Sequence, residues 1–336
     1  MTARSVGEPS SCTIISPRKS ARSSSIKLGV VAVGTVHTAV ALGMVSFGEF
    51  LAEAYRRPSN VDWCETNHAY SEWVAEMGNT LSSVPMCGVA FYGLYRARRH
   101  LRWESRWFWA WFMLAIVGVG SALFHATLRH VFQAADELPM LYCNLCFAYL
   151  MIEERASFPG ADVSANKTLR PSRKRWLAPL LVAAGAIQTY FYFAYPSVYE
   201  VFMVSYVVVV LWLVYRSVRL AWFSPDATKL QRLLVRIALA CYGGGAALWI
   251  FENVACGVKG PGSGLLPDGG GWWMQAAHLH AVWHAGACLG TYHFIEFCAA
   301  RRGAAVGARV SAGGGGWLPL YVTHEFGPHA RRTKRA

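Results

Sequence analysis

Long apolar runs recur along the chain and are separated by shorter polar or basic segments. Each run approaches the roughly 20 residues that an α-helix needs to cross the hydrocarbon core of a bilayer. The pattern predicts seven membrane-spanning helices, at residues 73–95, 107–125, 136–152, 176–195, 198–217, 233–252 and 272–298. We therefore expect an all-α membrane protein that folds as a seven-transmembrane-helix bundle.

A further hydrophobic run at residues 28–47 precedes these seven segments and follows a Ser- and Arg-rich stretch. Three interpretations remain open for it: a signal anchor, a cleaved signal sequence, or one extra N-terminal hydrophobic helix. The segment after the last predicted helix is basic and contains a run of four glycines, which predicts disorder. The expected organisation is an N-terminal extension at 1–60, a seven-helix domain at 61–299 and a disordered cytosolic tail at 300–336.

Composition agrees with a membrane protein, because 54% of the residues are hydrophobic and only 15% are charged, whereas soluble domains average about 25% charged residues. The formal net charge is +13. The basic residues gather in the loops after the first, third, fifth and seventh predicted helices, and such loops face the cytosol in membrane proteins. This rule places the C-terminus in the cytosol and residues 62–76 on the lumenal side. It also explains the positive charge without a nucleic-acid partner.

The sequence QAAHLHAVWH at residues 275–284 places two histidines four residues apart in the last predicted helix. His280 and His284 therefore share one helix face. His125 ends the second predicted helix on the same, lumenal side, so that the three imidazoles can meet. Three imidazoles that leave one coordination position open are the ligand set of a catalytic zinc ion. The spacing alone also fits histidines that are hydrogen-bonded to neighbouring helices.

Two further polar residues accompany these histidines. Asp136 opens the third predicted helix on the lumenal side, and a carboxylate beside a metal can orient a water molecule and accept its proton. Ser121 precedes His125 by four residues and so shares its helix face. The alternative for Asp136 is a helix N-cap, since Pro139 would then fall in the first turn. The alternative for Ser121 is ordinary helix packing.

A second polar cluster precedes the first predicted helix. Carboxylate and amide oxygens at close spacing suit a hard cation such as calcium. The side chains that supply them are Asp62, Glu65, Asn67 and Glu76. The spacing is not that of an EF-hand, and a solvated acidic loop that caps a helix is the alternative interpretation.

The nine cysteines fit no zinc-finger spacing. Cys64 and Cys256 are the two that the predicted topology places in lumenal segments, and lumenal compartments favour disulfides. We therefore predict a disulfide between them. Cys143 and Cys146 lie within an apolar run and are expected to be small core residues.

Taken together, the sequences DWCETN, GNTLSS, GVGSALFHATL, DELPMLY and HAVWH resemble the alkaline ceramidases. These enzymes belong to a superfamily of seven-helix membrane hydrolases that includes the adiponectin-receptor-like proteins. The resemblance spans residues 62–298 and implies hydrolysis of the amide bond of ceramide, with zinc and calcium as cofactors. The implied zinc site consists of His125, His280 and His284, with Ser121 and Asp136 beside the water at the zinc. The implied calcium ligands are Asp62, Trp63 through its backbone carbonyl, Glu65, Asn67 and Glu76.

The same resemblance favours a multi-pass protein of the endoplasmic reticulum or Golgi membrane, with membrane ceramide as substrate and no obligate protein partner. The chain departs from the family pattern in its N-terminal extension, in the Gly- and Pro-rich loop at 257–271, which we expect to be mobile, and in its Gly-rich tail. A related lipid hydrolase that remodels glycolipid anchors and a seven-helix receptor with a structural zinc remain alternative functions. A transporter would show broken helices or repeat symmetry, and the sequence shows neither.

Overall fold

The computed structural model describes residues 47–101, 104–157, 169–196, 199–257, 264–266, 278–315 and 318–325. The chain divides into two units, Met1–Ser46 and Phe47–Ala336, and every described residue belongs to the second unit. The hydrophobic run at 28–47 lies almost wholly outside the described residues, as does most of the loop at 257–271. The extra N-terminal helix and the mobile loop therefore stay predictions.

The described residues form seven long helices of 21 to 28 residues and one short helix. They are α2 (Phe47–Arg56), α3 (Met77–His100), α4 (Ser105–Thr127), α5 (His130–Ile152), α6 (Lys174–Ala194), α7 (Tyr199–Trp222), α8 (Lys229–Cys256) and α10 (Leu279–Ala305). At 1.5 Å per residue, even the shortest of the seven extends about 31 Å, close to the thickness of the hydrocarbon core. Each long helix overlaps one of the predicted segments.

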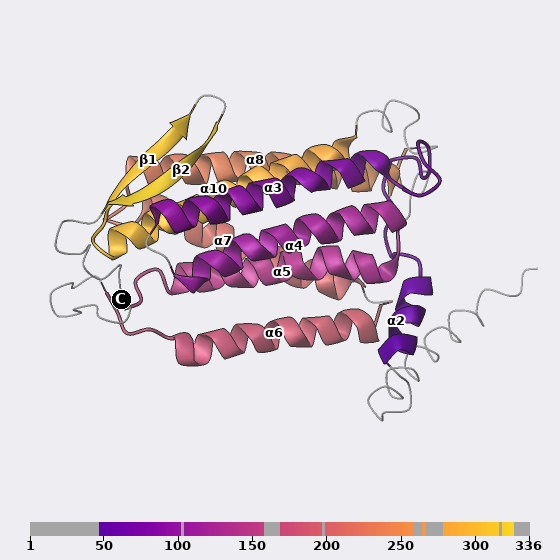
Figure 1. Ribbon diagram of the computed structural model, residues 1–336, viewed down its shortest axis with the longest axis horizontal. Coiled ribbons are helices and arrows are strands. Elements are labelled where there is room, and N and C mark those ends of the chain that lie inside the picture. Colours follow the sequence, from indigo (N-terminus) through magenta and orange to yellow (C-terminus); the bar gives the residue numbers. More distant parts are fainter. Residues whose placement is uncertain are drawn as a thin grey trace, which may run out of the picture. The chain divides into compact units, whose positions relative to one another are not determined.

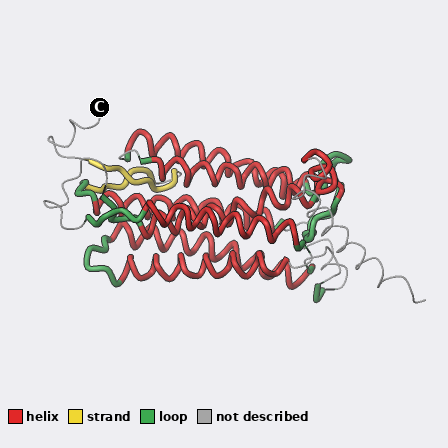
Figure 2. Tube along the Cα trace, turned by 90° about the horizontal axis from the view of Figure 1, so that it is seen from below, coloured by secondary structure: helices red, strands yellow, loops and turns green. Residues whose placement is uncertain are grey.

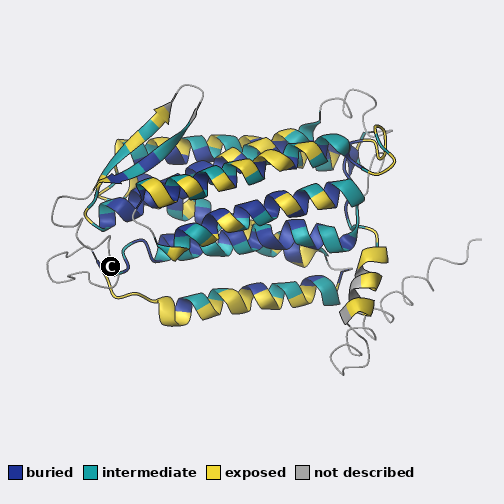
Figure 3. Cartoon of the chain, in the orientation of Figure 1, coloured by how far each residue is buried: buried dark blue, intermediate teal, exposed yellow. Residues whose placement is uncertain are grey.

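Four of these helices, α4, α6, α7 and α8, are long and apolar enough to cross a membrane. Helix α6 exposes most of its side chains, as helices that face lipid do (Figure 3). Helices α3, α5 and α10 instead bury polar side chains between helices. The protein is therefore an integral membrane protein with a helical bundle.

The neighbours of each helix define the bundle. Helix α10 packs against α8 and α3, and α4 packs against α3 and α5 (Figure 1). Helix α5 also contacts α6 and α7, and α7 contacts α8. The long helices run side by side, and a pair of strands lies along one end of them (Figure 2). This arrangement places α3 beside both α4 and α10. Helices α4 and α10 hold the three histidines of the predicted zinc site.

Helices α5 and α10 differ most from their predicted starts, at residues 136 and 272. Helix α5 starts at His130, so that Asp136 and Pro139 lie inside the helix and not in its first turn. Helix α10 starts at Leu279, because His278 adopts a left-handed backbone conformation with φ 44° that interrupts a right-handed helix. As a result, His280 lies in the first turn of α10. The predicted start at residue 272 would have placed it about two turns into that helix.

The backbones of α4 and α5 lie close together at Gly120. A Cβ atom at this position would lie 1.8 Å from the carbonyl oxygen of Ala135, so only glycine fits. That carbonyl lacks its usual helical hydrogen bond, because the donor would be the N–H of residue 139, which is Pro139. The contact brings Ser121 and Asp136, the sequence neighbours of Gly120 and Ala135, to the same level of the bundle.

The expectation of a disordered tail at 300–336 is wrong over its first part. Helix α10 continues to Ala305, and β1 (Arg309–Gly315) and β2 (Leu318–Glu325) then form an antiparallel hairpin against α10. Alternate residues of β2, Val322 and His324, are buried, and the N–H of Val322 donates to Oε2 of the buried Glu296 at 2.7 Å. The prediction missed this hairpin because the glycines of β1 indicated a flexible tail.

An ion-pair network closes the same end of the bundle. The buried Arg301 of α10 pairs with Glu154, just after α5, at 2.9 Å, and with Asp226, in the loop between α7 and α8, at 3.2 Å. Burial by itself would raise the pKa of Asp226, but the hydrogen bond with Ser224 and the charge of Arg301 outweigh it and lower that pKa. The network therefore ties three elements together through one guanidinium group.

Candidate metal centre

The structure brings His125, His280 and His284 together. His125 lies in the last turn of α4, and the other two lie in the first two turns of α10. All three side chains are buried, and one nitrogen of each lies within 4.8 Å of the others. Among the residues that the structure describes, this is the single group of three or more His, Cys, Asp or Glu side chains at such distances.

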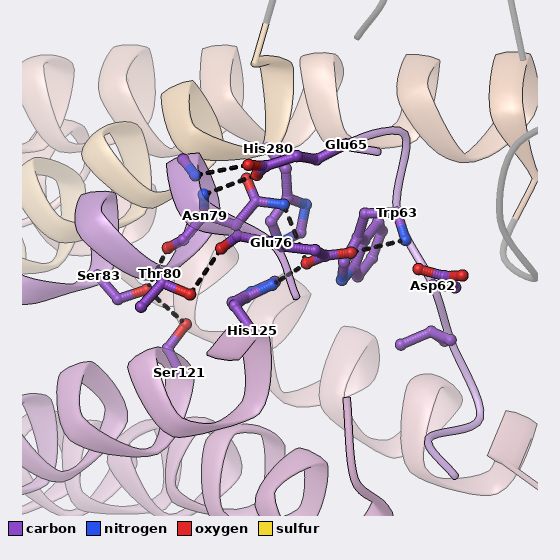
Figure 4. Close-up of polar contacts among 12 residues, drawn as sticks. Asp62, Trp63, Glu65, Glu76, Asn79, Thr80, Ser83, Ser121, His125 and His280 are labelled. Carbon is purple, nitrogen blue, oxygen red and sulfur yellow. Dashed lines mark hydrogen bonds and ion pairs between the residues drawn. The ribbon is translucent and has the colours of Figure 1, made fainter. Parts of the chain in front are cut away.

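Two of these imidazoles are held through their Nδ1 atoms by residues at the start of α3. Nδ1 of His125 lies 2.5 Å from Oε2 of Glu76 (Figure 4). Nδ1 of His284 lies 2.8 Å from Oγ of Ser82 and 3.3 Å from Oγ of Ser83. Both rings therefore keep Nε2 for a further ligand.

The third imidazole, His280, contacts two other residues. Its ring stacks on the indole of Trp63, with 3.9 Å between the ring centroids. Its Nδ1 lies 3.3 Å from Oε2 of Glu252 on α8. Each of the three rings thus has its Nδ1 within 3.3 Å of an oxygen of a neighbouring element.

This donor set fits a metal ion. Nε2 of His125 is buried and has no hydrogen-bond partner within the described part of the chain. An unpaired buried polar atom costs about 1–3 kcal/mol, and a metal bond at that nitrogen would remove the cost. Histidine ligands of metals commonly direct their second nitrogen to a carboxylate, as His125 does toward Glu76, and a carboxylate oxygen of Glu252 lies 3.3 Å from Nδ1 of His280. Three imidazoles arranged in this way match the protein ligands of a catalytic zinc ion.

Ser121 and Asp136 lie beside the histidines. Oγ of Ser121 accepts a hydrogen bond from Oγ of Ser83 at 3.1 Å and lies 3.5 Å from Nε2 of His284. Asp136 is buried, and its polar neighbours are His125 and Ser121. The N-cap alternative for Asp136 is wrong, because the N-cap of α5 is Arg129 and Asp136 lies nearly two turns further along.

The residues of the predicted calcium site are only partly assembled. Both carboxylate oxygens of Asp62 accept hydrogen bonds from Nδ2 of Asn67, at 3.2 and 3.1 Å. Burial raises the pKa of Asp62 to about 6; the hydrogen bond from Asn67 opposes this rise, and the nearby carboxyl group of Glu76 adds to it. A cation between these two carboxyl groups would favour their charged forms.

Glu65 has a different role in the structure. Its two carboxylate oxygens accept hydrogen bonds from the backbone N–H groups of Gly78 at 2.6 Å and Asn79 at 2.9 Å, in the first turn of α3 (Figure 4). This contact is the helix cap that the alternative interpretation expected of the acidic loop. Glu76 is also occupied on both oxygens, because Oε1 accepts the N–H of Trp63 at 3.2 Å and Oε2 contacts His125.

Three residues that contact the histidines, Ser82, Ser83 and Glu252, were not predicted from the sequence. Ser82 and Ser83 belong to the sequence GNTLSS, but nothing in their spacing indicates a partner on α10. Glu252 did carry a signal, because a carboxylate inside an apolar membrane segment is costly and requires a partner.

The predicted disulfide between Cys64 and Cys256 is confirmed, with 5.7 Å between the two Cα atoms. It joins the segment before α3 to the end of α8. Cys143 and Cys146 are free, with Cys143 buried and Cys146 partly buried, as expected for small core residues of α5.

These features define a class of protein: an integral membrane protein whose helical bundle encloses three buried histidines beside a buried aspartate and a serine. A family model for ceramidases matches residues 56–312. The chain belongs to the ceramidase family, and the relationship that its motifs predicted is confirmed.

Individual relatives agree with this assignment. The putative alkaline ceramidase dcd3A of Dictyostelium discoideum is 29% identical over 268 residues, which cover 73% of this chain and 87% of the relative. Alkaline ceramidase 3 of Mus musculus is 30% identical over 240 residues, which cover 71% and 82%. Alkaline ceramidase 1 of Homo sapiens is 25% identical over 229 residues, which cover 67% and 76%. The chain is therefore a hydrolase of the ceramidase family.

Proposed function

We propose that this protein hydrolyses the N-acyl amide bond of ceramide and releases a sphingoid base and a free fatty acid. Family membership and the names of the relatives support this substrate. The observation that carries the proposal is the convergence of His125, His280 and His284, which we assign as the ligands of a zinc ion.

A zinc ion held by three imidazoles supplies Lewis acidity, which polarises an amide carbonyl and makes a water molecule acidic near neutral pH. The carboxylate of Asp136 would accept a proton from the attacking water and deliver it to the amide nitrogen as the C–N bond breaks. Oγ of Ser121, oriented by the hydroxyl of Ser83, forms a hydrogen bond to the water or to the carbonyl oxygen. The hydroxyl of the water ends on the acyl carbon, so the products are a carboxylic acid and an amine.

The depth of the centre suits a lipid substrate. His125 lies at the end of α4 and His280 at the start of α10, so the centre lies near one end of the bundle and not at its middle. Ceramide carries its amide between a polar head and two long apolar chains, which places the scissile bond near the surface of a bilayer. A buried centre at the ends of the helices therefore meets the amide while the chains stay in the apolar layer.

We further propose that all seven long helices span the membrane. Helices α3, α5 and α10 are 24, 23 and 27 residues long, enough to cross a hydrocarbon core of about 30 Å. Their polar side chains are buried between helices, where such residues are tolerated. The basic loops then place the C-terminus in the cytosol and the metal centre on the lumenal side, in the membrane of the endoplasmic reticulum or Golgi.

Calcium is the second proposed cofactor. Asp62, Asn67 and Glu76 supply oxygens beside the backbone of Trp63, and calcium accepts carboxylate, amide and carbonyl oxygens together. Burial raises the pKa of Asp62 and the nearby carboxyl group of Glu76 adds to the rise; a bound cation would oppose both effects. Glu65 and Glu76 each hold hydrogen bonds on both oxygens, and a carboxylate oxygen keeps a second lone pair for a cation.

The direct test uses purified protein and ceramide that carries a labelled fatty acid. We expect release of the fatty acid, loss of release in a zinc chelator, and recovery when zinc is restored. His284→Ala should abolish both bound zinc and release, whereas the control His293→Gln, on the same helix but outside the centre, should retain both. Protein that holds zinc but releases no fatty acid would favour the receptor alternative, and release from glycolipid anchors but not ceramide would favour the remodelling alternative.

A further inference from the structure

Glu252 lies against the metal centre without a role in the proposed chemistry. Its side chain is buried near the end of α8, one turn before Cys256. Oε1 accepts the backbone N–H of Cys64 at 3.3 Å. Oε2 lies 3.3 Å from Nδ1 of His280, and neither of these two atoms forms a hydrogen bond with any residue that the structure describes.

The chemistry of a metal-bound imidazole explains this pair of atoms. A neutral imidazole has one N–H, so a histidine that binds a metal through Nε2 must carry its proton on Nδ1. The buried Oε2 of Glu252 lies 3.3 Å from Nδ1 of His280, within reach of an N–H on that nitrogen. Metal ligands commonly donate this N–H to a carboxylate, which fixes the tautomer and the orientation of the ring.

We propose that Glu252 is a positioning residue, whose carboxylate accepts the Nδ1–H of His280 and aims its Nε2 at the metal. The proposal rests on the proposed zinc site and assigns a residue to it that neither motif nor spacing identified. Glu76 stands in a similar relation to His125, with its Oε2 2.5 Å from Nδ1 of that ring. Two of the three imidazoles are then oriented by carboxylates, and the third by the hydroxyls of Ser82 and Ser83.

The surroundings of Glu252 hold its carboxylate in place. The indole of Trp63 covers one face of the His280 ring, so the ring keeps its plane and only the direction of its nitrogens is left to be set. The next residue, Cys64, donates its N–H to Glu252 and is bonded to Cys256 on the same helix as Glu252. The carboxylate is therefore fixed on one oxygen by a covalently tethered backbone and presents the other to His280.

Glu252→Gln tests the proposal with little change in volume. In the variant, an NH2 group replaces one of the two carboxylate oxygens. This NH2 group is a donor, and it must face either the N–H of Cys64 or the N–H of His280, which are donors as well. We expect the dissociation constant for zinc, measured by competition with a chromophoric chelator, to rise about 10- to 100-fold. The control Glu296→Gln changes an equally buried carboxylate of α10 that binds the hairpin, and should leave the zinc affinity within about twofold of wild type.

The outcomes separate the two proposals. Folded Glu252→Gln protein with wild-type zinc affinity overturns the positioning role, even if its thermal stability falls. Wild-type protein that binds zinc but does not hydrolyse ceramide overturns the proposed function, and the affinity comparison still decides the role of Glu252. Wild-type protein that binds no zinc overturns both. If Glu252→Gln does not fold, Glu252→Asp, which withdraws the carboxylate by one methylene, is measured in its place and the same loss of affinity is expected.

Discussion

Replacing Gly120 with alanine should force α4 and α5 apart. The new Cβ would lie 1.8 Å from the carbonyl oxygen of Ala135 and 2.9 Å from the backbone nitrogen of Asp136, whereas ordinary van der Waals contact begins at 3.4 Å. The nearer atom belongs to the backbone and cannot rotate away, so the helices must separate by about 1.6 Å (3.4 minus 1.8). Overpacking of this kind costs about 1–3 kcal/mol, against a gain of up to about 1 kcal/mol from helix propensity.

The same displacement should impair the chemistry, because it acts between Ser121 and Asp136. A misplacement of about 1 Å at a reacting centre can lower the rate about 10²-fold. We expect Gly120→Ala to lower both the midpoint of thermal unfolding in detergent micelles and the rate of ceramide hydrolysis.

Gly88→Ala on α3 is the matched control, since no described atom lies within 4 Å of its added Cβ. It should be as stable as wild type, or more stable by up to about 1 kcal/mol, and fully active. If the two alanine variants unfold at the same temperature and hydrolyse ceramide equally fast, α4 and α5 are not in backbone contact and the reasoning is refuted.

Three further predictions concern single carboxyl groups and calcium. Asp136→Asn should retain the fold and bound zinc but hydrolyse ceramide about 10²-fold more slowly or worse; a rate near wild type would assign the base elsewhere. Calcium should raise the midpoint of thermal unfolding, because a ligand that binds only the folded state stabilises it, and Asp62→Asn should reduce that rise; equal melting curves in calcium and in chelator would count against the site. The pKa of Asp226 is lowered by folding, so its contribution to stability is complete above its unfolded pKa, near 4, and is lost as the pH falls through the folded value. Asp226→Asn should therefore lose less thermal stability than wild type between about pH 5 and pH 3, and identical pH profiles would contradict the ion-pair network.

The helices and the histidine set were predictable because they depend on local spacing. Apolar runs of sufficient length indicate helices wherever they pack, and residues four apart share a helix face in any bundle. The alternating charge of the loops then placed His125 at the same end as His280 and His284. The pairing of Cys64 with Cys256 followed from the same topology, and the structure confirms it.

The ends of the helices and the supports of the site depend on tertiary contacts, which local spacing does not contain. Pro139 suggested that α5 starts near Asp136, whereas in the structure the carbonyl group of Ala135 that the proline leaves unpaired lies against Gly120 on α4. The partner of Glu252 at its Oε1 atom is 188 residues away in the chain. The tail was assigned from its glycines, and its hairpin is stabilised by Glu296 of α10.

The histidines of the centre are synthesised at well-separated times. His125 leaves the ribosome 155 residues (280 minus 125) before His280, an interval of about 10 to 30 s at typical elongation rates. Until α10 has been made, the chain holds one of the three imidazoles, and one nitrogen is a poor metal site. In the folded chain α10 lies between α3 and α8 and supplies the remaining two imidazoles from one helix. A metal held by all three histidines can therefore bind only after the final helix has been inserted, and bound metal would report that insertion.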